Sequence, residues 1–247
     1  MTLKFSGTRA LLIGGTCTIG LFLAERMIKK GLFPVLTYRN KEGNTCIKEV
    51  LEDYDDRYMT IYLDLGDPDS INSLFKRIDN DLDFLVDFAQ TGFESLIASA
   101  NHETVCKYFA QNVSSRFFII KRAARAMLKK KRGRMVFISS SAAKRANPGQ
   151  GFYAAAKLAS EAIYRNLGLE LGSRGITTVS LRPGYVDEGR GKDFINKSGK
   201  DVLEKVPIKR AINVKELAET ILFFLSDSAA GFNATEISMD GGLAAGK

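Results

Sequence analysis

The feature that most constrains the fold is a regular alternation of short apolar runs with amphipathic segments along the 247 residues. The apolar runs predict strands, and the helical periodicity between them predicts crossover helices. Strands that are apolar on both faces are typical of a parallel sheet covered by helices on both sides. The expected strands are residues 9–14, 33–38, 59–64, 83–89, 134–139, 177–182 and 235–240.

Right-handed crossovers between these strands predict a Rossmann-like, doubly wound α/β fold with about seven parallel strands. Helices are expected over residues 19–30, 42–51, 68–77, 103–130, 153–171 and 214–225. No repeat, low-complexity stretch or linker divides the chain, so residues 1–247 are expected to form a single domain. The segment 188–205 is polar, contains three glycines and follows the carboxyl end of a strand, where such sheets bind ligands. We therefore expect an irregular, mobile substrate lid over about 186–206, with an idle surface loop as the alternative.

Composition narrows the chemistry. The three cysteines are irregularly spaced and indicate a reducing compartment, and neither an 18-residue apolar run nor a secretory pattern is present. A cytoplasmic protein is expected, with an organelle as the alternative. His102 is the only histidine, which argues against a His-based metal site and against a serine triad, and it is expected at the surface. No metal site, membrane contact or nucleic-acid-binding motif is predicted.

A glycine-rich turn, GGTCTIG at residues 14–20, joins the first expected strand to the first helix. Glycines at such a turn let the backbone approach a pyrophosphate, whose charge the helix N-terminus attracts. Many glycine turns bind nothing, but the position after the first strand favours a dinucleotide.

The end of the second expected strand indicates which dinucleotide. A free ribose 2′-hydroxyl usually meets an acidic residue there, whereas this chain reads TYRNK and offers Arg39. A guanidinium pairs well with phosphate oxygens, so NADPH/NADP+ is predicted over NADH, unless Arg39 is only a surface cation. Asp64, at the end of the third strand, is placed to accept a hydrogen bond from the adenine amine.

Tyr153 and Lys157 are four residues apart on an expected helix and therefore share one face. A phenol titrates near pKa ~10, which is too high for efficient proton transfer at neutral pH. A cation one turn away favours the phenolate and is expected to lower the pKa of Tyr153. The alternative is a packed aromatic beside a solvated charge.

The motif YAAAK at residues 153–157, with Ser140 thirteen residues earlier and Asn112 further back, resembles the short-chain dehydrogenase/reductase family. The resemblance covers nearly the whole chain, including GGTCTIG, the pair Asp64-Leu65, RPG at residues 182–184 and DGG at residues 240–242. Within the family, GRMVFISSSAA, GQGFYAAAKLA and SRGITTVSLRPG are most similar to bacterial 3-oxoacyl-[acyl-carrier-protein] reductases.

The resemblance implies a role for each site residue. Tyr153 would donate the proton, Ser140 would orient the carbonyl oxygen, Lys157 would also hold the nicotinamide ribose, and Asn112 would fix a water that links Lys157 to solvent. The implied cofactor-binding residues are Gly14, Thr16, Thr18, Ile19, Arg39, Asp64, Leu65, Ala89, Tyr153, Lys157, Pro183, Gly184 and Val186.

The sequence departs from the family pattern in three places. Thr18 replaces the middle glycine of the first motif, as also happens in pteridine reductases. DFAQ at residues 87–90 replaces the usual Asn-Asn-Ala-Gly, and YVDE at residues 185–188 lacks the threonine that usually follows Pro-Gly. Weakened cofactor affinity is the expectation from these changes.

The substrate is indicated less directly. The resemblance implies that Lys131 and Arg174 match basic positions that meet an acidic acyl carrier protein, and a net charge of +8 suits steering of such a partner. We therefore expect reduction of 3-oxoacyl-[acyl-carrier-protein] in fatty acid or polyketide-like biosynthesis. The resemblance also implies assembly as a homotetramer. The alternatives are an NADPH reductase of a small pteridine, quinone or sugar, and a catalytically idle nucleotide-binding partner subunit.

Overall fold

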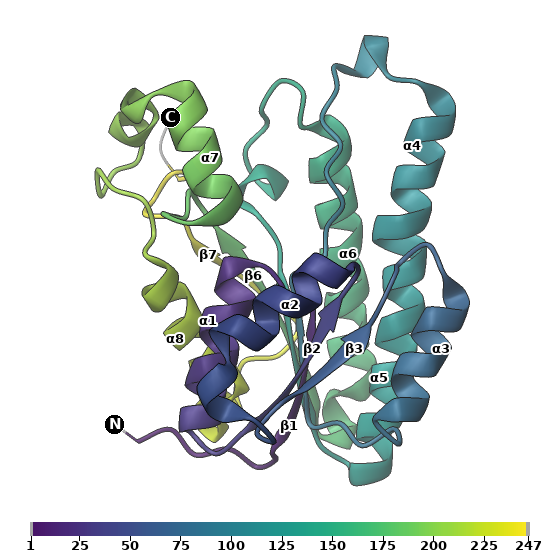
Figure 1. Cartoon of the computed structure of the whole chain (residues 1–247). Helices are drawn as coiled ribbons and strands as arrows, with labels where there is room; N and C mark the ends of the chain where they lie inside the picture. The colour runs from purple at the N-terminus through teal and green to yellow at the C-terminus, as the bar shows by residue number, and fades with distance from the viewer. Residues whose placement is uncertain (1, 246–247) are drawn as a thin grey trace.

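The computed structural model describes residues 2–245, apart from the side chain of Lys200, and contains one seven-stranded parallel sheet (Figure 1). Its strands lie in the order β3-β2-β1-β4-β5-β6-β7, so the winding direction reverses between β1 and β4. All seven expected strands are present: β1 Arg9–Ile13, β2 Phe33–Tyr38, β3 Met59–Tyr62, β4 Phe84–Asp87, β5 Gly133–Ile138, β6 Ile176–Pro183 and β7 Thr235–Met239.

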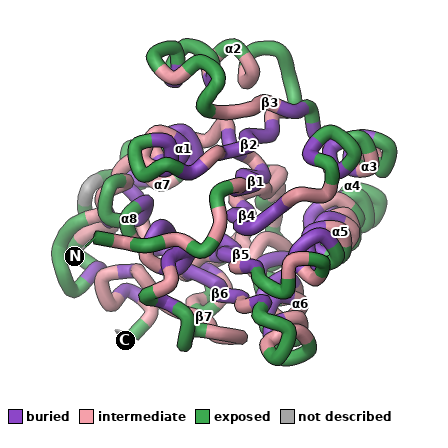
Figure 2. The backbone as a smooth tube through the Cα atoms, turned by 90° about the horizontal axis from the view of Figure 1, so that it is seen from below, coloured by how far each residue is buried: buried purple, intermediate pink, exposed green. Residues whose placement is uncertain are grey.

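Helices cover both faces of the sheet, as Figure 2 shows end-on. Successive residues of β1 alternate between two apolar cores: Leu12 packs with α1 and α8 on one face, and Leu11 packs with α3, α5 and α6 on the other. The doubly wound architecture is therefore confirmed. The helices are α1 Thr18–Lys29, α2 Lys41–Val50, α3 Pro68–Arg77, α4 His102–Phe109, α5 Ser115–Lys130, α6 Gly151–Leu171, α7 Gly189–Ser198 and α8 Val214–Leu225.

Two expected segments differ in detail. The helix predicted over 103–130 is interrupted by a π-helical turn, Ala110–Ser114, which separates α4 from α5. The segment predicted to be irregular instead forms α7 and a 3-10 turn, Lys200–Lys205. Gly189, the first residue of α7, and Gly199, its C-cap, both adopt positive φ angles, which glycine tolerates. His102 begins α4 after the N-cap Asn101 and is exposed.

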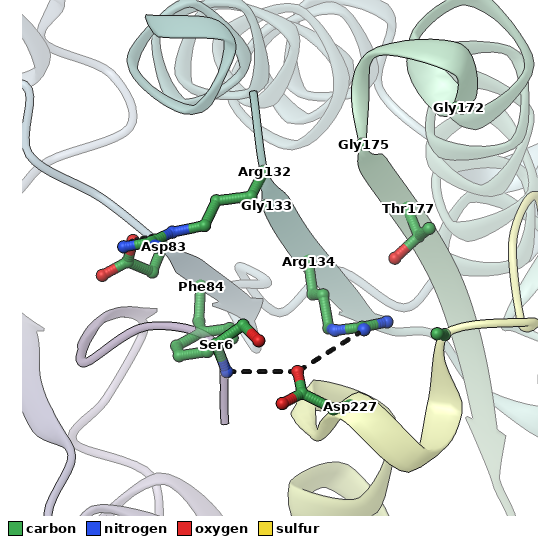
Figure 3. Close-up of a pocket in the computed structure, with 11 residues that line it drawn as sticks. Ser6, Asp83, Phe84, Arg132, Gly133, Arg134, Gly172, Gly175, Thr177 and Asp227 are labelled. Carbon is green, nitrogen blue, oxygen red and sulfur yellow. Dashed lines mark hydrogen bonds and ion pairs between the residues drawn. The ribbon is translucent and has the colours of Figure 1, made fainter. Parts of the chain in front are cut away.

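The amino ends of the strands form the opposite end of the molecule from the site described below. A cavity of about 280 Å³ lies there between the starts of β4, β5 and β6 (Figure 3). Asp83 accepts hydrogen bonds from Lys130 and Arg132 beside it, and Arg134 lies 3.9 Å from Asp227. Across residues 2–245, no helix has the length and apolar character needed to cross a membrane.

Candidate active site

The candidate site lies at the carboxyl ends of β1 and β4, where the strand order reverses and parallel α/β sheets bind their ligands. The turn after β1 passes against the turn after β4: a Cβ on Gly14 would lie 3.0 Å from the backbone of Ala89. Gly14 has φ +73° and donates its N–H to the Thr37 hydroxyl at 2.9 Å. Glycine is therefore required at position 14 by both conformation and space.

The first turn of α1 offers backbone donors at this place. The Cys17 thiol caps α1 by accepting from Gly20 N, and the first intrahelical bond runs from Leu21 N to Cys17 O at 3.0 Å. The N–H groups of Thr18 and Ile19 precede that bond and have no backbone acceptor within the helix. Thr18 is exposed, so its side chain does not close this end of the helix. The turn therefore fits a pyrophosphate despite the missing glycine.

The residues predicted to contact the adenosine follow β2 and β3. Arg39 follows β2 and is exposed, and Asp64 lies half-buried beyond β3 with one carboxylate oxygen accepting from Gly66 N at 2.8 Å. Leu65 packs against the apolar core of that face. Thr16 packs against the start of α2, where a Cβ on Gly43 would lie 2.9 Å from its methyl group.

The turn after β6 forms another part of the wall. Gly184 has no room for a side chain, since a Cβ would lie 2.9 Å from the Asp240 backbone. Pro183 ends β6, and the side chain of Val186 is buried in the core. Asp187 bonds Val214 N at 2.9 Å and the Asn213 side chain at 2.7 Å. Its charge thus stabilises the N-terminus of α8.

Asn112 lies in the π-helical turn and is completely buried. Its side-chain oxygen accepts from Thr91 N at 2.9 Å, and its amide nitrogen donates to Thr91 Oγ1 and to Tyr108 O. The turn that displaces Asn112 from α-helical register therefore ties α4 to the loop after β4. These contacts place the side chain of Asn112 in a structural network.

Tyr153 and Lys157 share one face of α6, and the Lys157 Nζ lies 5.8 Å from the centre of the Tyr153 ring. Lys157 is buried, donates to Ile138 O at 2.7 Å and lies 4.8 Å from the centre of the Phe137 ring. Ser140 follows β5, and its hydroxyl accepts from Ala142 N at 3.1 Å and is hydrogen-bonded to Tyr153. The fold thus brings four residues to the carboxyl ends of β4 and β5 and the amino-terminal part of α6: Asn112, Ser140, Tyr153 and Lys157.

The electrostatics differ from the sequence prediction. Burial raises the pKa of Tyr153 above its ordinary value, and the hydrogen bond with Ser140 only partly offsets this rise. Burial, reinforced by the charge of Arg116, lowers the pKa of Lys157 to about 7. The expectation that the pKa of Tyr153 is lowered is therefore wrong for this structure, because desolvation outweighs the hydrogen bond with Ser140 and the charges of Arg190 and Arg116.

A buried ion pair that the sequence analysis missed lies behind these residues. Arg116 Nε donates to Asp87 Oδ2 at 2.7 Å, and both side chains are at most 3% exposed. The guanidinium also bonds Asn112 O, Ala89 O and, at 3.1 Å, Ser160 Oγ. Tyr164 donates to the same Asp87 oxygen. The aspartate that replaces the usual asparagine was the available signal, since a buried carboxylate requires a counter-charge.

Two predicted residues lie elsewhere. Lys131 and Arg174 are exposed and precede β5 and β6, so they lie at the amino end of the sheet. They are close to one another, since a Cβ on Gly175 would lie 2.4 Å from Lys131 O. The fold therefore separates this basic pair from Tyr153 by the length of β5.

Comparisons with known proteins agree with this geometry. A family model described as "Enoyl-(Acyl carrier protein) reductase" matches residues 15–244. The 3-oxoacyl-[acyl-carrier-protein] reductase FabG of Haemophilus influenzae is 30% identical over 240 residues, 96% of this chain and 98% of that protein. A solved structure titled as a putative betaketoacyl-ACP reductase is 28% identical, with a TM-score of 0.86 over 98% of this chain and 100% of its own. A single-residue variant of actinorhodin polyketide ketoreductase, solved with NADPH, is 26% identical, with a TM-score of 0.89 over 96% of this chain and 97% of its own.

The fold and site define an oxidoreductase that interconverts carbonyl and alcohol groups with a nicotinamide cofactor. The chain belongs to the short-chain dehydrogenase/reductase family.

Proposed function

We propose that this protein reduces a ketone to a secondary alcohol with NADPH, and that its substrate is a 3-oxoacyl group on an acyl carrier protein. The observation that carries the proposal is the convergence of Ser140, Tyr153 and Lys157 beside the glycine-rich turn, at the switch point of the sheet. The relatives with ketoreductase names support the reaction class.

The residues divide the chemistry among them. Bound NADPH supplies the hydride that the carbonyl carbon receives. The Ser140 hydroxyl donates a hydrogen bond to the carbonyl oxygen, and Tyr153 donates the proton that completes the alcohol. Burial raises the pKa of Tyr153, so the phenol carries the proton to be donated at neutral pH. Lys157 holds the nicotinamide ribose, and negative charge on the developing phenolate favours its ammonium form.

NADPH is preferred because Arg39 is exposed at the end of β2 and positions 37–41 hold no carboxylate. A guanidinium there pairs with a 2′-phosphate, whereas an acidic residue would bond a 2′-hydroxyl. Changing Arg39 to Ala is expected to weaken NADPH binding and leave NADH binding unchanged, as measured by nucleotide fluorescence. Equal effects on both nucleotides would contradict this specificity.

The direct test of the reaction is Tyr153→Phe. The variant keeps the ring and its packing but lacks the proton, so we expect turnover to fall by at least about 100-fold with NADPH affinity retained. NADPH oxidation is followed with a 3-oxoacyl thioester, and binding by fluorescence titration. Turnover near the wild-type rate would reject the assignment. Loss of both activity and NADPH binding would indicate a damaged site and require Ser140→Ala as a second variant.

The carrier-protein substrate is supported by the exposed pair Lys131 and Arg174 and by the charge of +8. Because this pair lies at the amino end of the sheet, a carrier docked there would serve the site of a neighbouring subunit. Reversing both charges to Glu is expected to impair reduction of the carrier-bound substrate and to spare a small thioester surrogate. Equal loss on both substrates, or efficient turnover of free small ketones, would favour a small-molecule reductase.

Such delivery requires an oligomer, and we infer a homotetramer. Phe117, Leu158 and Leu169 on α5 and α6 are 46–70% exposed, and an interface would remove this apolar surface from water. Sedimentation velocity measures the state directly. A monomer at micromolar concentration would contradict both the assembly and delivery between subunits.

A further inference from the structure

The first turn of α7 lies over the glycine-rich turn that follows β1. Gly189 has φ +57°, and a Cβ there would lie 4.0 Å from the Thr18 hydroxyl. Gly191 has no room for a side chain, since a Cβ would lie 2.3 Å from Val186 O. Farther along α7, Phe194 stacks on Tyr185 with ring centres 5.4 Å apart. The two glycines and the aromatic stack fix the direction in which the residue between the glycines projects.

That residue is Arg190, and its side chain crosses to the opposite wall of the site. Its Nη2 donates to Gln90 O at 2.8 Å, in the loop that follows β4. Gln90 is itself held by Tyr108, to which its amide donates at 2.5 Å. The guanidinium thus links the segment after β6 to the segment after β4, and β5 is the strand that lies between these two in the sheet.

The charge of Arg190 contributes to the pKa shifts of Cys17, Tyr153 and Lys157. Burial raises the pKa of the Cys17 thiol in the glycine-rich turn, and Arg190 acts against that rise. Burial also raises the pKa of Tyr153, and the charge of Arg190 opposes this rise. Burial and the charge of Arg116 lower the pKa of Lys157, and the charge of Arg190 lowers it further. The guanidinium therefore lies within electrostatic range of the turn at Cys17 and of the pair Tyr153 and Lys157.

We propose that Arg190 binds the diphosphate of the dinucleotide, exchanging its bond to Gln90 O for phosphate oxygens and holding α7 closed over the cofactor. This proposal rests on the proposed dinucleotide cofactor. The N–H groups of Thr18 and Ile19, at the start of α1, mark where the diphosphate lies. Arg190 directly follows Gly189, and a Cβ added to that glycine would lie 4.0 Å from the Thr18 hydroxyl. A planar guanidinium can bind two phosphate oxygens at once. Arg190 thereby supplies a cation where Thr18 replaces glycine.

The test is the affinity of Arg190→Ala and Arg190→Lys for NADPH and NADH, measured by nucleotide fluorescence. Both nucleotides carry the diphosphate, so Arg190→Ala is expected to raise both dissociation constants by a similar factor of about 10 to 100, the value of a charged hydrogen bond. Arg190→Lys retains the charge but lacks the planar guanidinium, so its dissociation constants should lie between those of the wild type and of Arg190→Ala. Lys192→Ala, on the same helix and bonded only to Glu188 among the described residues, is the matched control and should leave both constants unchanged.

Lid closure gives a second readout. NADPH should protect α7 from limited proteolysis in the wild type and in Lys192→Ala, and should protect it less in Arg190→Ala at equal saturation. Unchanged nucleotide affinity in Arg190→Ala would overturn the proposal, as would a rise in the substrate KM alone, which would assign Arg190 to the substrate. If the wild type bound neither nucleotide, the proposed function would fail together with this inference. If the wild type bound both and Arg190→Ala behaved like it, the inference alone would fail.

Discussion

Strand β4 has a buried aspartate at each end, and the two are neutralised in different ways. Asp83, before the strand, is 2% exposed and accepts from Lys130, from Arg132 and from the N–H groups of Thr8 and Arg9. Asp87, the last residue of the strand, is also 2% exposed, but its cation Arg116 is fully enclosed. The Asp83 carboxylate pairs with partly exposed cations at the surface, whereas the Asp87 carboxylate pairs with a buried guanidinium.

The difference lies in what each cation touches next. Lys130 also pairs with Asp81, and Arg132 is half-exposed, so the network at Asp83 ends at the surface. Arg116 continues to the backbone oxygens of Ala89 and Asn112, beside the candidate catalytic residues. The Asp83 end therefore contributes to stability alone, whereas the Asp87 end couples stability to the geometry and charge of the site.

The largest loss of folding stability is expected from Arg116→Met. The change leaves Asp87 buried without its cation, which costs about 3–5 kcal/mol in comparable buried pairs. It also frees Asn112 O and Ala89 O, so NADPH affinity should fall as well. Urea unfolding and nucleotide titration measure the two effects. Stability within about 1 kcal/mol of the wild type would show that the pair is dispensable.

Asp83→Asn should have an intermediate effect on stability and none on the site. Losing charged hydrogen bonds at a buried carboxylate costs about 1–3 kcal/mol at neutral pH. Burial acts to raise the pKa of Asp83, but hydrogen bonds from Lys130, Thr8 and Arg9 outweigh it and lower the pKa below 3.8. The stabilisation is therefore complete above the unfolded pKa and is lost as pH falls through the folded value. The difference between wild type and variant should narrow below pH ~4, and a constant difference in urea unfolding would contradict this origin.

Arg132→Ala should have the smallest effect. The side chain is 51% exposed and Asp83 retains Lys130 and two backbone donors, so a loss of at most about 1 kcal/mol is expected. High salt should diminish the difference, which thermal unfolding at two ionic strengths measures. A loss as large as that of Arg116→Met would remove the distinction between the two ends.

Sequence periodicity predicted all seven strands, because each is a largely apolar run bounded by turn residues. The five inner strands are mostly buried, whereas the edge strands β3 and β7 are mostly half-buried. It missed α7, since that helix is polar and buries only Ile195, while contacts from distant Gln90 and Tyr185 hold it in place. The motif spacing predicted which residues converge, but not the pKa of Tyr153, which depends on burial created by the whole fold.

Arg116 illustrates the remaining limit. On its own it is one more cation in a helix, and its partner Asp87 lies 29 residues earlier. Asp87 stands where the family usually has asparagine, and a buried carboxylate requires a cation nearby. The sequence pattern does not say which cation supplies the charge. Only the packing of α5 against β4 identifies the arginine that supplies it.

The most direct test of the difference between the two ends is the pH dependence of NADPH affinity in Asp87→Asn/Arg116→Met and in Asp83→Asn. Burial and then Arg116 lower the pKa of Lys157 to about 7, and Asp87 opposes this less strongly than Arg116 promotes it. Neutralising both should therefore raise that pKa, so affinity should persist to higher pH than in the wild type. Lys157→Met supplies the baseline without this titration. We predict an upward shift of the midpoint in the double variant and none in Asp83→Asn; an unmoved midpoint in the double variant, or equal shifts in both, would contradict the account.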